Sequence, residues 1–465
     1  MKEAYIINPP DKNIEEMHIT KDMAGGFGFN AGQGVVLPAL ELIYHTLTLK
    51  KQNYNIHYYD FQAEPEKIND LFKIMPKSGK ILVLVLVTNP TLNTDLLFIK
   101  KIKEVNKETL IFVKFDVKSE ETIRQILKSG LVETVLVGET ENSIHKIFEE
   151  SAKEGTAYLE NEAVIFGPSL IIKNMDELLD LELDFLNLAK YKYPLLPTKK
   201  GNFFSFQSSR GCPFPCAYYC PYPLTQGNIW RSMSEKKLYV NIELLVKKYN
   251  IGAILFRDAT FTLDKKRVND FCGDILVKNL KFKWWCETRM NCLDEELLKE
   301  MSKAGCVGIN LGVETGDDAL MRKQGKIGGD INQLIKIRSL SSKYKIQLHF
   351  LMIVGLPEET KKSLYKSFLI IEKLKPESLG VTTITPYPGT PLYHDAIKNN
   401  WIIDKNLVNY IGNKVVMKSK YLSPRQIKHG NFLLRLAGYL NKQRHPFYAL
   451  MNKFLKIYFF LWSKI

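Results

Sequence analysis

The chain has 465 residues, more than one hydrophobic core usually serves, so two or three domains are expected. A hydrophobic content of 45% and a charged content of 25% describe an ordinary globular protein and not a disordered one. The formal net charge is +15, but residues 396–465 carry thirteen Lys or Arg against one acid, Asp404, which argues against a nucleic-acid-binding face spread over the whole protein.

The first 150 residues alternate between apolar runs and amphipathic stretches. This alternation predicts a doubly wound parallel sheet, and we expect a Rossmann-like domain over residues 1–150. The opening run, Met1–Pro10, is interpreted as a core strand and not as a signal peptide. The predicted strands are Ala4–Ile7, Asn55–Tyr59, Ile81–Thr88, Leu110–Phe115 and Glu133–Val137, and the predicted helices are Val36–Lys50, Asn93–Val105 and Glu120–Ser129.

A sheet of this type binds ligands at the carboxyl ends of its strands. Polar or turn-forming residues occupy these ends, and we expect them to line a ligand site. They are Asn8, Pro9, Asp60, Thr88, Gly138 and Glu139.

Residues 151–200 are rich in proline and predict a connector between domains. Over residues 201–395 strand and helix alternate again. Six such units predict a partial (β/α) barrel with its chemistry at the carboxyl ends of the strands. The predicted barrel strands are Phe203–Ser208, Ala253–Phe256, Lys283–Glu287, Val307–Leu311, Gln347–Ile353 and Ser378–Thr383.

Three cysteines follow the first barrel strand on one short loop: Cys212, Cys216 and Cys220. Three thiolates can hold three irons of a 4Fe–4S cluster and leave the fourth iron open to a small molecule, which indicates catalysis more than electron storage. The alternatives are a disulfide or a zinc site, although zinc usually takes four ligands and no nearby His or Cys completes the set. The other cysteines are interpreted as small core residues: Cys272, Cys286, Cys292 and Cys306.

The later barrel strands end in polar motifs, at Phe256–Phe261, Trp284–Arg289, Gly308–Gly316, Met352–Thr360 and Pro386–Thr390. Together with the cysteine loop, these five ordered motifs resemble those of the radical S-adenosylmethionine (SAM) enzymes, over about residues 200 to 395. That family usually places two residues between its last two cysteines. Here there are three, because two tyrosines stand where one aromatic residue is expected.

The resemblance implies that SAM chelates the open iron. It also implies that one electron, delivered to the cluster by an external donor such as flavodoxin or ferredoxin, generates a 5′-deoxyadenosyl radical. Carboxylates suit the SAM amine or ribose hydroxyls, an arginine suits its carboxylate, and a glycine lets backbone pass close to the adenine. A rim ion pair, for example Glu287 with Arg289, is the structural alternative for each acid. The implied SAM contacts are Tyr218, Asp258, Glu287, Arg289, Glu314 and Gly355.

Residues 1–150 resemble the cobalamin-binding domain that precedes the catalytic domain in one large radical SAM subfamily. The resemblance implies bound cobalamin at the strand ends named above. Two features depart from the pattern: no Asp-x-His-x-x-Gly run occurs, and Lys114, Phe115 and Asp116 replace a Gly-Gly turn that would let a large ligand approach the backbone. The alternative is a Rossmann-like scaffold with an empty or repurposed cleft. The matching pieces are Asn8–Pro10, Pro38–Leu42, Asp60, Thr88–Thr91 and Val137–Glu141.

Residues 396–465 predict a small, basic, helical C-terminal region. Residues 447–462 are rich in aromatic side chains interrupted by lysines, and they are too short and too charged to span a bilayer comfortably. Two arrangements fit: a helix packed against the barrel, which we favour, and an interfacial helix on an anionic membrane surface.

These features predict an anaerobic radical SAM enzyme, first of all a cobalamin-dependent methyltransferase acting on an unactivated carbon. The first alternative is a radical SAM isomerase, oxidase or ring-forming enzyme without cobalamin, and the second is a zinc-stabilised, basic nucleic-acid-binding protein. We expect a small-molecule or lipid-type substrate and no nucleic-acid partner. We also expect a cytoplasmic location, peripheral to the membrane if the tail binds there, because a reducing compartment suits thiolates and an oxygen-sensitive cluster.

Overall fold

The structure, a computed structural model, describes residues 2–10, 19–21, 29–30, 34–115, 117–150, 152–325, 329–443 and 446–464. The chain divides into two compact units. The first unit comprises Met1–Gly211, Pro221–Leu255 and Leu407–Ile411, and the second comprises Cys212–Cys220, Phe256–Asn406 and Gly412–Ile465.

The first unit contains a seven-stranded sheet in the order β4-β1-β5-β6-β7-β8-β9. Five neighbouring strands, from β4 to β7, are parallel, and all five were predicted. The strands are β1 (Glu3–Asn8), β4 (Asn55–Asp60), β5 (Leu82–Leu86), β6 (Leu110–Lys114), β7 (Thr134–Leu136), β8 (Thr156–Glu160) and β9 (Ala163–Phe166), with a separate two-stranded pair, β2 (Ile19–Thr20) and β3 (Phe29–Asn30).

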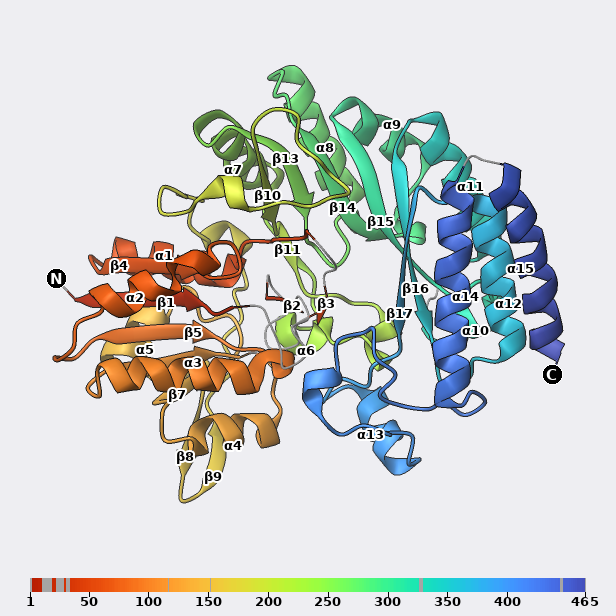
Figure 1. Cartoon of the computed structure of the whole chain (residues 1–465). Coiled ribbons are helices and arrows are strands. Elements are labelled where there is room, and N and C mark those ends of the chain that lie inside the picture. The colour runs from red at the N-terminus through yellow and green to blue at the C-terminus, as the bar shows by residue number, and fades with distance from the viewer. Residues whose placement is uncertain are drawn as a thin grey trace. The chain divides into compact units, whose positions relative to one another are not determined.

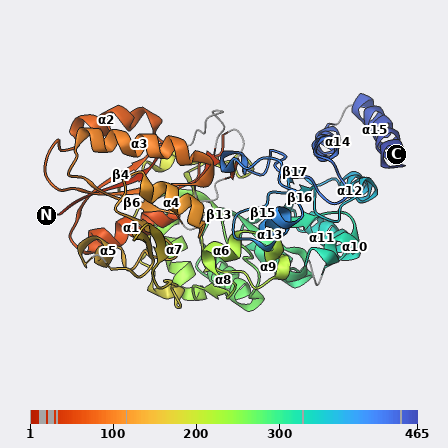
Figure 2. The ribbon, with the colours of Figure 1, turned by 90° about the horizontal axis from the view of Figure 1, so that it is seen from below.

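Helices cover both faces of this sheet. Figure 2 shows α2 and α3 on one side of the strands and α1 and α5 on the other. The arrangement follows from the sequence, because strands such as β5 are entirely apolar and buried and therefore need cover on both faces. The helices are α1 (Leu40–Lys51), α2 (Ile68–Ile74), α3 (Leu92–Val105), α4 (Glu120–Lys128) and α5 (Ile144–Glu150), followed by α6 (Tyr222–Gln226) and α7 (Glu235–Lys248) later in the unit.

The order of the parallel strands fixes where a ligand can lie. In chain order it is 2-1-3-4-5, a doubly wound arrangement in which ligands bind at the carboxyl ends, next to the central first strand. Asn8 ends β1 and is paired in register with Asp60 at the end of β4. The predicted ligand residues therefore stand at the edge that this topology favours.

The predicted connector begins with regular structure. Strands β8 and β9 form an antiparallel hairpin that extends the first sheet past β7. The turn between them places Asn161 and Glu162 at φ of 47° and 65°. The segment that follows, up to the first barrel strand, contains only the short 3-10 helices η3 (Met175–Glu177) and η4 (Leu188–Lys190) within the described residues.

A second sheet has six strands in the order β10-β13-β14-β15-β16-β17. All six predicted barrel strands are present in sequence order, and the pairings from β14 to β17 are parallel, which confirms the partial barrel. The strands are β10 (Asn202–Phe206), β13 (Ile251–Phe256), β14 (Lys283–Arg289), β15 (Cys306–Glu314), β16 (Gln347–Val354) and β17 (Ser378–Thr383).

Helices between these strands begin at polar caps. Asp264, Asp294, Asp330 and Thr360 each accept a hydrogen bond from a backbone N–H in the first turn of the helix that follows. These caps set where each strand–helix connection ends, and hence the length of the rim loops. The helices of the second unit are α8 (Lys265–Val277), α9 (Glu295–Lys303), α10 (Asp318–Lys323), α11 (Ile331–Lys343), α12 (Lys361–Leu374) and α13 (Pro391–Lys398).

The basic tail is helical, as predicted, and folds onto the second unit. Helices α14 (Pro424–Lys442) and α15 (Pro446–Lys464) stand beside α12 (Figure 1). Arg435 of α14 donates to the carbonyl oxygen of Val381 in β17 at 2.6 Å. Among the described residues, no helix combines the length and the apolar character needed to cross a membrane.

Candidate functional site

The cysteine loop is introduced by a tight backbone turn. Gly211 has a φ of 80°, and a Cβ at this position would lie 2.0 Å from the carbonyl oxygen of Ile229, so no other residue fits there without a shift of the backbone. The loop continues through the short 3-10 helix η5 (Pro215–Tyr218). The glycine therefore fixes the point from which the three cysteines are presented.

None of the three cysteines forms a disulfide within the described part of the chain. Cys212 and Cys216 are buried and Cys220 is partly exposed. Cys216 and Cys220 belong to an apolar cluster with Leu356 and Ile384, which lie just after the carboxyl ends of β16 and β17. The loop thus lies at the carboxyl ends of these barrel strands, where the sequence placed it.

Arg289, at the end of β14, is held against this loop. Its guanidinium donates to Sγ of Cys216 at 3.5 Å and lies 3.9 Å from the ring centre of Phe214, and it also donates to Oδ1 of Asn291 at 3.2 Å. A cation beside a thiol favours the thiolate, which is the form that binds iron. Arg289 therefore places a positive charge next to the cysteine loop.

The two tyrosines of the loop lie in different surroundings. The hydroxyl of Tyr218 donates to Oδ2 of Asp395 in α13 at 2.9 Å. Tyr219 is buried, and its hydroxyl oxygen has no hydrogen-bond partner. Burial, followed by the charge of Glu314 and the nearby Cys216 and Cys220, raises the pKa of Tyr219 well above its usual value. Sequence reasoning named Tyr218; the structure brings Tyr219 beside the cysteines.

Glu314 ends β15 in an unusual backbone conformation. Its φ is 65°, and the pairing of β15 with β16 shifts register between Gly312 and Glu314. A non-glycine residue at positive φ is uncommon and is a feature of functional sites. The shift re-aims the strand end, and the carboxylate lies near Tyr219.

Glu287, also on β14, is held in a polar network. It forms an ion pair with Arg257 and accepts from Nδ2 of Asn310 at 3.1 Å, while Asn310 accepts from the indole of Trp285 at 2.8 Å. The ion pair suggested from the sequence, Glu287 with Arg289, is not the one found, because Arg289 turns to Cys216. Asp258, which follows β13, is fully buried.

Gly355 is required by packing as well as by backbone conformation. Its φ is 96°, and a Cβ there would lie 3.0 Å from Ile384 and 3.1 Å from Ile427. Its N–H donates to Glu359 at 2.5 Å. Glu359 is fully buried, its Oε1 has no partner, and burial raises its pKa to about 8.

These residues fit an iron–sulfur cluster with three protein ligands. In the described part of the chain, no group of three or more His, Cys, Asp or Glu side chains is arranged to hold one metal ion. A cluster makes a different demand, because each thiolate binds its own iron. Three thiols on one loop, largely buried and outside any disulfide of the described residues, with a cation beside one of them, meet that demand.

In the first unit, the candidate ligand edge is a network of buried polar groups. Asp60 accepts from Nδ2 of Asn8 and from the hydroxyl of Tyr191, both at 2.9 Å. Burial raises the pKa of Asp60 to about 6, although these donors act in the opposite direction. Pro9 is buried beside them, and the remaining acceptor, Oδ1 of Asn8, is buried without a partner.

Thr88 and Gly138 stand at the ends of β5 and β7. Thr88 is buried and shares a hydrogen bond with Thr91 at 2.7 Å. The carbonyl oxygen of Gly138 accepts from Nζ of Lys114 at 2.6 Å, and that amine lies 3.9 Å from Glu41. Lys114 thus fills the space next to β7, as its size suggested.

Glu139 joins this edge to the segment that precedes the cysteine loop. It forms an ion pair with Arg231 at 2.7 Å and lies 3.7 Å from Arg210, which in turn pairs with Glu141 at 2.6 Å. All of these side chains are largely buried. Arg210 stands two residues before Cys212, and sequence reasoning missed it because nothing in the local pattern marks its distant partners.

The edge offers a partial fit to cobalamin. The unpartnered oxygen of Asn8 can accept a hydrogen bond from an amide group, and the corrin periphery carries amides. Lys114 and Phe115 are buried where a Gly-Gly turn would leave room, and Asp116 lies outside the described residues. The edge at β1 is therefore the part that suits such a ligand.

Part of the barrel matches a known family. Residues 206–371 match the model of the Radical SAM superfamily. An uncharacterized methyltransferase of Pyrococcus horikoshii is 28% identical over 85% of this chain and 86% of its own length.

Two solved structures share the fold. The cobalamin-dependent SAM radical enzyme OxsB, with aqua-cobalamin and SAM bound, has a TM-score of 0.69 at 14% identity and covers 98% of this chain and 75% of its own. The radical SAM methyltransferase TsrM of Kitasatospora setae, with cobalamin and a [4Fe-4S] cluster bound, has a TM-score of 0.64 at 14% identity over 92% of this chain and 82% of its own. Residues 206–371 therefore match the radical SAM superfamily, and the chain as a whole shares its fold with OxsB and TsrM.

Proposed function

We propose that the protein is a cobalamin-dependent radical SAM methyltransferase that acts on an unactivated carbon of a small-molecule or lipid-type substrate. The observation that carries the proposal is the cysteine loop: three thiols outside any disulfide of the described chain, at the carboxyl ends of the barrel strands, one of them in contact with Arg289. The relatives that are methyltransferases by name support the reaction type.

In this proposal Cys212, Cys216 and Cys220 hold three irons, and SAM binds the fourth. When bound, the cluster and SAM supply one-electron chemistry that removes a hydrogen atom from the substrate, and cobalamin supplies the methyl group. An external donor such as flavodoxin or ferredoxin would supply the electron. The chain's own residues bind and orient these groups and keep water away.

The rim residues have distinct tasks in the proposal. Arg289 pairs with the SAM carboxylate next to the cysteine loop, since its guanidinium already lies there. Glu314 binds the SAM amine, and Tyr219 covers the site with its buried ring. Glu287 is held by Arg257 and orients the rim. The further SAM contacts proposed are Tyr218, Asp258 and Gly355.

Cobalamin binds, in the proposal, at the carboxyl ends of the first sheet. The free acceptor of Asn8 and the adjoining Pro9 and Asp60 form its polar edge. This choice rests on the strand order and on the cobalamin-dependent structures that share the fold. The other strand-end residues proposed are Thr88, Gly138 and Glu139.

The test is anaerobic reconstitution with iron, sulfide, hydroxocobalamin, SAM and dithionite. We expect 5′-deoxyadenosine from the wild-type protein, and with a methyl acceptor S-adenosylhomocysteine as well. Cys216→Ala should lose the cluster absorbance and all 5′-deoxyadenosine. Cys272→Ala, which changes an equally buried thiol in α8, should keep both. A full yield of 5′-deoxyadenosine from Cys216→Ala would refute the cluster assignment.

A second candidate is a radical SAM enzyme without cobalamin, which would be an isomerase, oxidase or ring-forming enzyme. Lys114 favours it, because its buried side chain fills space beside β7. Anaerobic purification with hydroxocobalamin separates the two. Corrin absorbance that is retained after gel filtration, and is lost in Asn8→Leu, supports the first candidate; a cluster spectrum with no corrin supports the second.

A further inference from the structure

Helix α15 presents apolar side chains on two opposite faces. Its inner face packs on α12: Phe459 is fully buried, with ring centres 5.2 Å from Phe368 and 5.8 Å from Tyr365. An ordinary surface helix has one apolar face, which turns to the core, and a polar face, which turns to water. The outer face of α15 should therefore be polar, and it is not.

The outer face carries a continuous apolar stripe, called here the α15 stripe. Its members recur every three or four residues, which aligns them along one side of a helix. They are exposed; Phe454, for example, is 63% exposed and Ile457 is 58% exposed. The α15 stripe comprises Phe447, Leu450, Met451, Phe454, Ile457 and Leu461.

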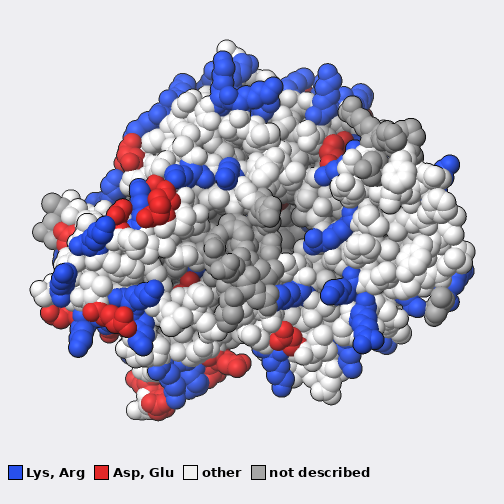
Figure 3. All heavy atoms as spheres, in the orientation of Figure 1, with Lys and Arg blue, Asp and Glu red and all other residues white. Residues whose placement is uncertain are grey.

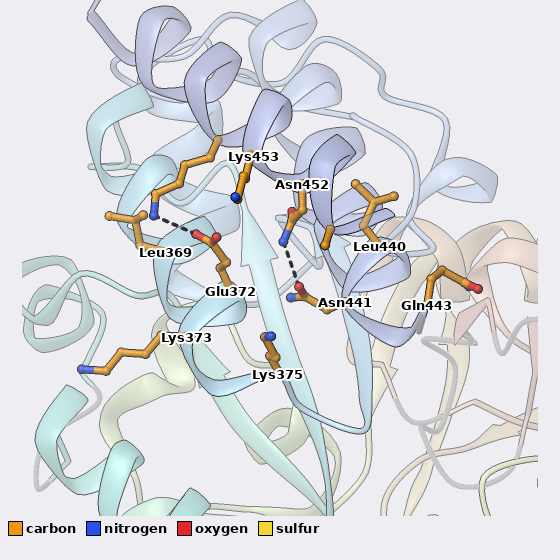
Figure 4. A pocket seen from close by; sticks show the side chains of 11 residues that line it. Leu369, Glu372, Lys373, Lys375, Leu440, Asn441, Gln443, Asn452 and Lys453 are labelled. Carbon is orange, nitrogen blue, oxygen red and sulfur yellow. Dashed lines mark hydrogen bonds and ion pairs between the residues drawn. The ribbon is translucent and has the colours of Figure 1, made fainter. Parts of the chain in front are cut away.

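Lysines flank this stripe and gather at a neighbouring hollow. A cavity of about 590 Å³ lies among α12, α14 and α15, and Figure 4 shows the side chains from these helices around it. Four lysines line it, against one acid, Glu372, which already pairs with Lys456 at 3.3 Å. The lysines are Lys373, Lys375, Lys453 and Lys456.

The tail that forms α14 and α15 is strongly basic. Residues 396–465 hold thirteen Lys or Arg and a single acid, Asp404. In Figure 3 the region over α14 and α15 is mostly white, with Lys and Arg at its margin. An exposed apolar face bordered by lysines fits a surface that is negatively charged on the outside and apolar beneath.

We propose that α15 docks the enzyme on an anionic lipid bilayer. The α15 stripe enters the boundary between headgroups and acyl chains, and the lysine cavity receives the phosphate of an anionic headgroup. The apolar and the electrostatic parts act together, as in interfacial helices generally. This inference goes beyond the proposed function and does not depend on it.

Vesicle flotation with the full-length protein tests the proposal. We expect binding to an equimolar mixture of phosphatidylcholine and phosphatidylglycerol, and little binding to phosphatidylcholine alone. Phe454→Asp should weaken binding at least ~10-fold, because an exposed aromatic anchor is replaced by a charge that the lipid repels. Val277→Asp removes an even more exposed apolar side chain from α8 and should have no effect.

A second pair of variants tests the lysine cavity. Lys373→Gln combined with Lys453→Gln should weaken binding to the anionic vesicles on the order of 10-fold and reduce its dependence on salt. Lys77→Gln with Lys80→Gln makes the same change in charge in the first unit and should alter binding far less. All four positions are exposed, so folding is unaffected and thermal melting serves as the check.

Two outcomes would overturn the proposal. One is equal vesicle binding by the wild-type protein and Phe454→Asp. The other is a dimer in light scattering that Phe454→Asp dissociates while neither protein binds vesicles; that result would assign the α15 stripe to a second copy of the chain.

Discussion

Glu359 gives the protein a pH dependence that a surface acid would not. It lies buried in the loop after β16, and burial raises its pKa to about 8 from the usual 4.5. The folded state therefore binds a proton that the unfolded state releases between pH 4.5 and 8. The free energy of unfolding should fall as the pH rises through that window.

Chemical denaturation at several pH values checks this prediction. Glu359→Gln mimics the protonated acid. It should remove the part of the pH dependence of stability between pH 4.5 and 8 that comes from Glu359 and leave the part that comes from other titrating groups. The neighbouring Glu358 is paired with Lys323 and Lys420 near the surface, so Glu358→Gln should retain the slope of the wild-type protein. Identical slopes in the wild type and Glu359→Gln would show that the acid titrates normally.

Arg289 permits a test of SAM binding that leaves the cysteines in place. Arg289→Met keeps the stacking volume over Phe214 but removes the charge-assisted hydrogen bonds, each of which contributes about 1.5–3 kcal/mol. We expect 5′-deoxyadenosine formation to fall at least ~10-fold. The iron content should stay at the wild-type level.

Arg338→Met is the matched control. Arg338 lies on α11 and pairs with Glu377 at 2.8 Å, away from the cysteine loop. It should leave both measurements unchanged. Loss of iron in Arg289→Met would mean that the arginine stabilises the cluster itself and not the bound SAM.

At the scale of elements, a substitution of Lys114 at the end of β6 tests what fills the edge of the first sheet. Lys114 donates to Gly138 and lies 3.9 Å from Glu41, and all three are buried or nearly so. Lys114→Met leaves a buried carboxylate and a carbonyl with a lost partner, so it should lower the free energy of unfolding by about 3–5 kcal/mol.

Urea denaturation measures this change. Lys118, four residues after Lys114, is an exposed lysine that donates a hydrogen bond to Ser169. Lys118→Met should lower the free energy of unfolding by less than about 1 kcal/mol. A Lys114→Met protein as stable as the wild type, with new affinity for hydroxocobalamin, would show instead that Lys114 only occupies the ligand space.

The elements themselves were predictable where hydrophobic patterning is strong. All five parallel strands of the first sheet and all six of the second were found from apolar runs bounded by turn residues. The β8–β9 hairpin was missed. Its turn places Glu162 at positive φ, a position that Gly or Asn usually occupies in hairpin turns, so the usual turn signal is missing there. The nearby prolines indicated an irregular segment instead.

The candidate site was predictable only in part. A strand end is visible in sequence, because an apolar run stops there, so the rim residues could be named. Their partners could not, since these depend on side-chain directions across strands. Glu287 pairs with Arg257 and not with Arg289, and Tyr219 turns to the cysteines while Tyr218 turns to Asp395.

At the scale of the whole molecule, the outward apolar face of α15 also governs solubility. In dilute buffer the surrounding lysines of separate molecules repel one another and keep the stripes apart. Salt shortens the reach of that repulsion from about 10 Å at 0.1 M to about 3 Å at 1 M, while the attraction between apolar side chains persists. Concentrated salt should therefore make this protein self-associate, and Phe454→Asp should keep it monomeric.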